Sequence, residues 1–244
     1  MSRMAAPELP YLSNVTCSVL AQHNIPLVVN LTTVGENLQD QTNTELIYTS
    51  PTNHTGAGTY LGHPTVADIF GSNTTNVAND VKNNLPIYAA KVSAASNGTM
   101  SESNLLSLFQ TQYDIIFNNP TPIAEVLVTP KGADFYSEYW GLMPFARGNV
   151  HIASTDPLAQ PVINPNYMML EFDMQQQVGS ARFLRTIYKT APMSKETTGE
   201  SSPGYTTVPA DATDAQWASW INSVCKNKPR EASSFTELTV NSAL

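Results

Sequence analysis

Residues 138–152 read EYWGLMPFARGNVHI, and predicted strands lie at the end of this stretch and upstream of it. Its end runs into residues 148–154, where apolar Val150 and Ile152 alternate with polar neighbours, as in a half-buried strand. Residues 123–128, upstream of the stretch, form a short apolar run that also predicts a strand. This part of the chain is therefore predicted to belong to a sheet.

Helices are predicted on both sides of this stretch. Residues 102–117, 168–190 and 213–224 each place apolar side chains at the three- and four-residue spacing of a helix with one buried face. In the last of them, Thr213 and Gln216 have the spacing of a capping box. Strands and helices alternate irregularly, so the predicted fold class is α/β or α+β, with a sheet backed by helices.

The remaining segments predict less regular structure. Residues 25–31 (IPLVVNL) indicate a short buried strand, and residues 34–41 indicate a polar turn. Residues 42–101 are rich in Thr, Asn, Ser, Gly and Pro and predict long surface excursions, with one short helix possible over 76–84. Residues 192–210 are expected to form a loop of similar composition.

The composition excludes two classes of partner. Only 13% of the residues are charged, and the formal net charge is −8 with a pI near 4.9. A basic groove for nucleic acid is not expected, because phosphate binding needs clustered Lys and Arg. No apolar run reaches membrane-spanning length, so no membrane partner is expected either.

Glycosylation signals point to the secretory pathway. Five Asn-x-Ser/Thr sequons occur in the first hundred residues, which favours a secreted, extracellular glycoprotein. The N-terminal residues lack the apolar segment of a signal peptide, so the true N-terminus is expected to lie upstream. The predicted glycosylation sites are Asn14, Asn30, Asn53, Asn73 and Asn97.

No catalytic centre follows from residue spacing alone. There is no nucleophile elbow of the Gly-x-Ser-x-Gly type, and two cysteines, Cys17 and Cys225, are too few for a zinc site or a disulfide framework. No metal site is predicted, because none of the four histidines has a metal-ligand spacing. They are His23, His54, His63 and His151.

Three stretches taken together resemble the glucose-methanol-choline (GMC) oxidoreductases. They are VGENLQDQ (34–41), the stretch 138–152 and DPLAQPVINPNY (156–167), and the resemblance covers roughly residues 24–224. It is closest to fungal FAD-dependent glucose dehydrogenases and glucose oxidases. The resemblance implies an antiparallel sheet backed by helices, which is the substrate-binding part of such an enzyme, beside an incomplete FAD domain.

The resemblance also implies a chemistry and a site. FAD would take the hydride from a CH–OH group of a small sugar or alcohol. Residues resembling Glu138 and Trp140 line the sugar pocket of the family, and Asn37 and Asp40 lie in a stretch near its flavin. For Glu138 and Trp140 the alternative is a capped strand end and a core tryptophan, and for Asn37 and Asp40 it is turn chemistry beside Gly35.

Departures from the family limit these expectations. The family's Gly-rich phosphate loop would precede this sequence, and the segment around Ser13 lacks the family's glycines. Residues 225–231 read CKNKPRE where the family has the turn with its catalytic histidine, and no histidine follows. No catalytic residue is therefore assigned, and the predicted division is a remnant of the FAD-binding domain (1–41), a substrate-binding region (42–224) with its GMC C-terminal segment from about 140, and an atypical tail (225–244).

These departures predict a fragment of a FAD-dependent oxidoreductase that is inactive alone. Two alternatives stay open. The chain is a non-catalytic secreted glycoprotein that binds carbohydrate through Glu138 and Trp140, or it is not stably folded by itself. The oligomeric state is not indicated by the sequence.

Overall fold

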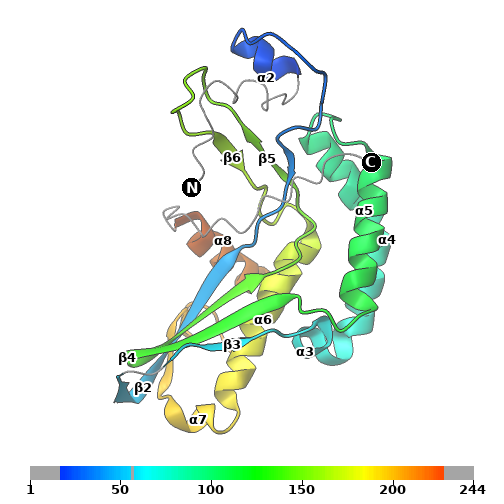
Figure 1. Cartoon of the computed structure of the whole chain (residues 1–244). Coiled ribbons are helices and arrows are strands. Elements are labelled where there is room, and N and C mark those ends of the chain that lie inside the picture. The colour runs from blue at the N-terminus through cyan, green and yellow to red at the C-terminus, as the bar shows by residue number, and fades with distance from the viewer. Residues whose placement is uncertain (1–16, 56–57, 228–244) are drawn as a thin grey trace.

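The described part of the chain folds into two antiparallel sheets with helices packed beside them (Figure 1). The computed structural model describes residues 17–55 and 58–227. The strands are β1 (Glu36–Leu38), β2 (Asn43–His54), β3 (Tyr60–Gly62), β4 (Ala124–Gly141), β5 (Gly148–His151), β6 (Val162–Asn164) and β7 (Gly199–Ser202). The helices are α2 (Cys17–Gln22), α3 (Val66–Phe70), the 3-10 turn Gly71–Asn73, α4 (Thr74–Ala95), α5 (Glu102–Phe117), α6 (Glu171–Lys189), α7 (Met193–Glu196) and α8 (Asp214–Asn227).

The larger sheet is built around the long strands β2 and β4. Its strand order is β3-β4-β2-β7, and the pairs are antiparallel. Side chains of a strand alternate between its two faces. In β2 and β4 one set is buried and the other is half-buried over residues 43–49 and 134–141. One face of this sheet is therefore covered and the other is partly open.

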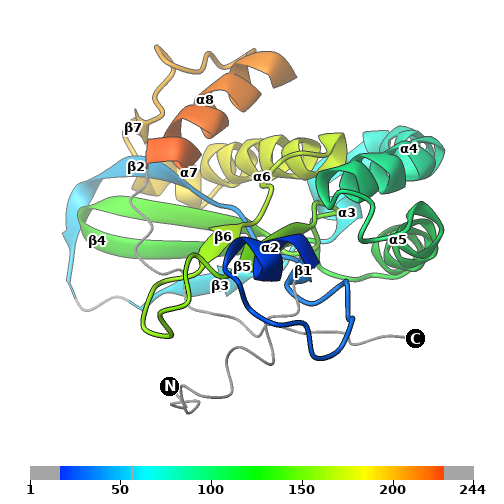
Figure 2. The ribbon, with the colours of Figure 1, turned by 90° about the horizontal axis from the view of Figure 1, so that it is seen from above.

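Helices α6 and α8 cover the buried face (Figure 2). Leu46, Tyr48 and Tyr139 from the sheet pack in one core cluster with Leu184 of α6 and Trp217 of α8. The helical spacing of apolar residues in 168–190 and 213–224 arises because these residues face the sheet. The predicted antiparallel sheet backed by helices is confirmed.

A second core lies between α4, α5 and the start of α6. Figure 1 shows α4 and α5 side by side, at the edge of the molecule away from α8. Phe145 lies in this core, with ring centroids 5.4 Å from Phe109 of α5 and 5.6 Å from Phe172 of α6. The segment between β4 and β5 is therefore anchored by a buried aromatic ring.

The smaller sheet joins three short strands in the order β1-β5-β6. β1 pairs with β5 just as β2 pairs with β4, so residues 36–49 and 134–149 run antiparallel to each other through both sheets. The passage from one sheet to the other lies between Leu38 and Asn43. These two antiparallel segments, here called the ribbon, position the candidate site, although no strand pairing is formed between residues 39–42 and 142–147.

The prediction of surface excursions over 42–101 is wrong. That range holds the 12-residue strand β2 and the 22-residue helix α4, which extends well beyond the helix expected at 76–84. The strand was hidden because Thr44 and Ser50 are two of its buried residues, so polarity does not alternate along it. The helix was hidden by its asparagine-rich exposed side and by Pro86 within it.

Two further expectations are corrected. Residues 25–31 form no strand, and Leu27, Val28 and Leu31 are each about half exposed. An apolar run forms a strand only where a neighbouring strand supplies hydrogen-bond partners for its backbone. β5 supplies these partners from Glu36 onwards, and β1 therefore begins there. The expected loop 192–210 contains α7 and β7, and β7 extends the larger sheet beside β2. The helix over 102–117 is confirmed at both ends.

Candidate functional site

The three sequence stretches that share one family resemblance meet in space. In the ribbon of β1 and β5, Glu36 lies opposite Asn149 and Leu38 lies opposite Gly148. The amide of Gln39 donates to the carbonyl of Pro144 at 2.7 Å, and the hydroxyl of Tyr167 donates to the carboxylate of Asp40. One region around β1 and β5 therefore contains segments separated by more than a hundred residues in the chain.

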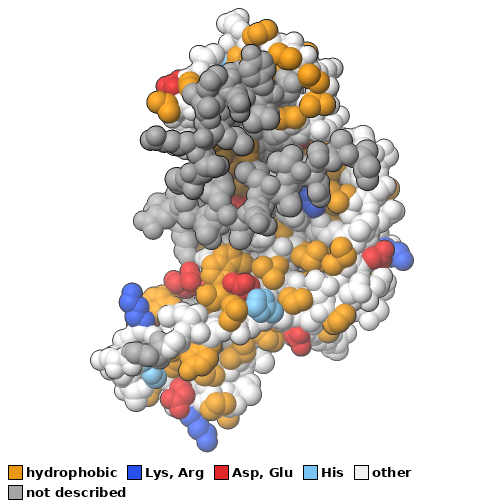
Figure 3. Space-filling model, viewed as in Figure 1, with side chains coloured by type: hydrophobic (Ala, Val, Ile, Leu, Met, Phe, Trp, Pro, Cys, Tyr) orange, Lys and Arg blue, Asp and Glu red, His pale blue; other side chains and the backbone are white. Residues whose placement is uncertain are grey.

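Glu138 and Trp140 lie on the partly open face of the larger sheet. Both are half-buried, whereas Tyr139 between them is fully buried against α6 and α8. In the strand register, Glu138 is opposite Glu45 and Trp140 is opposite Asn43. Figure 3 shows this face, with hydrophobic and acidic side chains mixed over the strands. Trp140 is therefore not a core tryptophan, which was the alternative to a role in substrate binding.

Such a face has the chemistry to bind a polyol. A carboxylate accepts hydrogen bonds from hydroxyl groups, and an indole offers an apolar surface with an N–H at its edge. Trp140 is at the end of β4 that leads towards β5, and Asn43 opposite it follows Asp40 by three residues. The ribbon therefore brings the two predicted substrate residues to the end of the larger sheet nearest the two predicted cofactor residues.

Asn37 and Asp40 have different surroundings. Asn37 has a backbone φ of +63°, a left-handed conformation that asparagine tolerates better than most residues. Its side-chain oxygen is buried and accepts no hydrogen bond from the described residues. Asp40 accepts from Tyr167 and, at 2.9 Å, from the backbone N–H of Gln41. Asn37 therefore offers a buried acceptor, whereas Asp40 is already engaged in the fold.

A buried pair beside them was missed by sequence reasoning. His151 Nε2 lies 3.3 Å from a carboxylate oxygen of Glu36, and the Glu36 side chain is only 3% exposed. Burial raises the pKa of Glu36 to about 7 and lowers the pKa of His151. No role was assigned to His151 from the sequence, and its ring faces Glu36 of β1. The only available signal was that both residues belong to stretches of the same family resemblance.

A polar cluster holds the segment between β4 and β5. The carboxylate of Asp173 on α6 accepts the backbone N–H groups of Phe145 and Ala146 at 2.6 and 3.0 Å. Gln112 of α5 donates to the carbonyls of Met143 and Pro144. This segment is therefore fixed from two helices, and Asp173 was not predicted from the sequence.

Arg147 completes this cluster from within the segment. Its guanidinium is buried, donates to Gln112 at 2.7 Å and lies 5.4 Å from the ring centroid of Phe109. Burial lowers the pKa of Arg147 to about 10, which leaves it charged near neutral pH. We assign Arg147 a structural role, because its guanidinium also donates to the backbone carbonyls of Pro144 and Ala146.

The described sequon residues are accessible. The side chains of Asn30, Asn53, Asn73 and Asn97 are all exposed, and Asn14 lies outside the described residues. Within the described part of the chain no three His, Cys, Asp or Glu side chains come together as a metal site would require. No helix among these residues is long and apolar enough to cross a membrane.

A family model described as GMC oxidoreductase matches residues 144–232. This segment belongs to the GMC oxidoreductase family. It contains β5 and β6, which lie beside β1 in the smaller sheet, and α6 and α8, which cover the buried face of the larger sheet. The resemblance inferred from the three stretches is thus confirmed.

Known proteins support the same assignment over a longer part of the chain. The glucose oxidase-like protein fsoC of Humicola fuscoatra is 33% identical over 190 residues, which are 78% of this chain and 32% of that protein. The chain spans about a third of the length of such curated relatives. The name of this relative therefore describes a protein that is much longer than this chain.

Two solved oxidoreductase structures share the fold of this chain. A fungal aryl-alcohol oxidase matches with a TM-score of 0.69 at 19% identity, covering 88% of this chain and 41% of that one. An FAD-dependent oxidoreductase from Chaetomium thermophilum matches with a TM-score of 0.63 at 20% identity, covering 86% and 40%. At these identities the likeness concerns the fold.

Proposed function

We propose that this chain supplies the substrate-side part of an FAD-dependent oxidoreductase that acts on the CH–OH group of a sugar or alcohol. The observation that carries the proposal is the convergence of residues 34–41, 138–152 and 156–167 around the β1–β5 ribbon. The family match over 144–232 and the glucose oxidase-like relative support a redox role. The exposed sequon residues support secretion as a glycoprotein.

The residues of the site would have separate roles in substrate and flavin binding. Glu138 and Trp140 would bind the substrate on the partly open sheet face, the carboxylate accepting hydroxyl hydrogen bonds and the indole covering an apolar side. Asn37 fits a flavin, because its buried side-chain oxygen is an acceptor without a described partner and a flavin ring carries N–H and C=O groups on one edge. Asp40 would act indirectly by holding Tyr167.

FAD, when bound, would accept the hydride of the CH–OH group. The Glu36–His151 pair is the only His–carboxylate pair described in the β1–β5 ribbon. Its pKa shifts would let it hold a proton near neutral pH, but we assign it no catalytic step. The chain's own contribution is therefore binding and orientation of the substrate.

We further propose that the 244-residue chain alone neither retains FAD nor oxidises glucose. It spans only about a third of its curated relatives, so the surfaces that enclose the rest of a flavin are expected elsewhere in such proteins. The test is the visible spectrum of the purified chain after incubation with FAD and desalting, together with a dye-linked glucose assay. A yellow, active preparation would contradict this proposal.

A further inference from the structure

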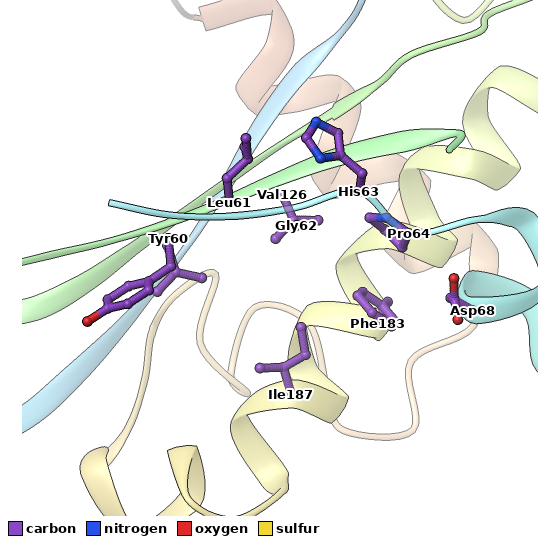
Figure 4. A pocket seen from close by; sticks show the side chains of 10 residues that line it. Tyr60, Leu61, Gly62, His63, Pro64, Asp68, Val126, Phe183 and Ile187 are labelled. Carbon is purple, nitrogen blue, oxygen red and sulfur yellow. The ribbon is translucent and has the colours of Figure 1, made fainter. Parts of the chain in front are cut away.

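A cavity outside the site described above lies between the edge strand β3 and helix α6. Its volume is about 360 Å³, which is within the range of small-molecule sites. Figure 4 shows its lining: the ring of Tyr60 lies at one end and Asp68 of α3 at the other, with Val126, Phe183 and Ile187 between them. No residue of the three family stretches lines it.

The apolar part of this cavity is formed by side chains of β4 and α6. Val126 is a buried residue of β4 whose side chain points to the α6 side of the sheet, and Phe183 and Ile187 are one helical turn apart on α6. Tyr60 is 66% exposed, because β3 is the edge strand at this end of the larger sheet. The cavity therefore presents an accessible aromatic ring beside an aliphatic and aromatic floor.

Its charge comes from a single carboxylate. Asp68 caps the start of α3, where one of its oxygens accepts the backbone N–H and the hydroxyl of Thr65. These hydrogen bonds lower the pKa of Asp68, so it is ionised at neutral pH. Glu125 and His63 pair with each other at 3.4 Å, and in Figure 4 His63 points to the opposite side of β3 from Ile187. Among the described lining residues, Asp68 is thus the one negative charge.

We propose that this cavity binds a small amphiphilic cation, namely an aromatic ring joined by a short chain to an ammonium group. The ring would lie on the apolar floor beside Tyr60, and the ammonium would approach the Asp68 carboxylate. Aromatic faces and carboxylates both attract cations. The net charge of −8 adds a general attraction for cations and a repulsion for anions. This inference does not depend on the proposed redox function.

The test uses three ligands of nearly equal shape. The whole 244-residue chain, labelled with ¹⁵N, is titrated separately with 2-phenylethylamine, 2-phenylethanol and phenylacetate. For ligands of this size we expect dissociation constants on the order of 1 mM. The amine should bind about three- to fivefold more tightly than the alcohol, as expected for one exposed ion pair, and the carboxylate should bind most weakly. Amide shifts should occur at residues 60–64, 126–128 and 183–187.

Variants separate the charge from the apolar floor. Asp68→Asn should remove the preference for the amine over the alcohol and leave alcohol binding unchanged. Asp211→Asn removes the same charge from another exposed site and should change neither. Tyr60→Ala should weaken both ligands, whereas Ile115→Ala should not, because Ile115 is an exposed apolar residue of α5 that does not line the cavity.

Each outcome decides the proposal. The affinity order amine, alcohol, carboxylate, abolished only by Asp68→Asn, would support it. Equal affinity of the three ligands, an amine preference that survives Asp68→Asn, shifts elsewhere in the chain, or absence of amine binding up to about 20 mM would each overturn it. Unchanged far-ultraviolet circular dichroism of Asp68→Asn shows that the variant is folded, and the alcohol titration then reports on the cavity itself.

Discussion

The carboxylate of Asp173 accepts the backbone N–H of Phe145 at 2.6 Å, deep inside the protein. It accepts a second backbone N–H, from Ala146, with its other oxygen. A helix residue thereby fixes the segment that joins the larger sheet to the smaller one. Because that segment carries the ribbon from Trp140 to β5, the position of the candidate site depends on this contact.

Replacing Asp173 should therefore cost stability. Asp173→Asn replaces one acceptor oxygen by an N–H donor that faces another donor, and we expect a loss of about 2 kcal/mol in the free energy of unfolding. Urea unfolding followed by tryptophan fluorescence measures it. Glu171→Gln is the matched control, because Glu171 is an exposed acid in the same helical turn and should change stability little. Equal stability of the two variants would show that the Asp173 contact is not formed.

Glycine is required at position 148 for a different reason. An added Cβ would lie 1.9 Å from the carbonyl oxygen of Asn164 and 2.6 Å from Pro165 Cα, which are backbone atoms of the neighbouring strand region. Gly148→Ala should destabilise the protein by about 2 kcal/mol or more, because β5 and β6 must separate. Gly199→Ala, at a strand position with open space around it, serves as control. A similar thermal midpoint for both variants would contradict the packing of β5 on β6.

Two ion pairs offer a contrast in burial. Arg185 and Glu200 are 5% and 0% exposed, pair at 2.6 Å, and Tyr48 also donates to Glu200. Glu200→Gln leaves a buried charge without its partner and should cost about 3 kcal/mol or more. Asp214→Asn removes the partner of Arg182 at an exposed site and should cost less than about 1 kcal/mol. Chemical denaturation of both variants measures this difference, and equal losses would contradict it.

The Glu36–His151 pair predicts a pH dependence of stability. The pKa of Glu36 in the folded state is about 7, above its ordinary value of 4.5, so the folded state holds a proton that the unfolded state has lost between these values. The contribution of Glu36 is therefore present at low pH and is lost as pH rises through about 7. The lowered pKa of His151 acts in the opposite direction, since protonation of His151 at low pH costs stability.

The variant Glu36→Gln isolates the first of these effects. In the unmodified chain, Glu36 should lower the free energy of unfolding by roughly 2–3 kcal/mol between pH 5 and pH 8. In the variant this decrease should be absent. Urea unfolding of both proteins at the two pH values measures this difference. A variant whose stability changes with pH as that of the unmodified chain does would show that Glu36 titrates normally.

The sequence predicted the parts of the fold whose burial is apolar and periodic. The helices at 102–117, 168–190 and 213–224 were found because their buried positions carry Leu, Phe, Ile, Val and Trp at helical spacing. Strand β2 and helix α4 were missed because Thr44, Ser50 and an asparagine-rich surface mask the period. Propensity and polarity are local signals, whereas burial depends on which distant strand lies opposite.

The candidate site could be predicted only in part for the same reason. Glu138, Trp140, Asn37 and Asp40 came from a family resemblance, and their roles remain predictions. Asp173 and the Glu36–His151 pair depend on contacts between residues 27 to 115 positions apart in the chain. No local pattern marks such contacts, because each partner alone is an ordinary acid or histidine on a helix or strand.

The central claim, that the partly open sheet face binds the substrate of a CH–OH oxidoreductase, is tested most directly in a flavin-loaded protein. A chimera of the glucose oxidase-like relative would carry the matched 190 residues of this chain in place of its own, with and without Trp140→Ala. We predict that the chimera oxidises a sugar or alcohol, and that Trp140→Ala lowers kcat/KM at least about tenfold, or about 1.4 kcal/mol, at unchanged FAD content. A flavin-loaded chimera whose kcat/KM is the same with alanine at position 140 would contradict the claim.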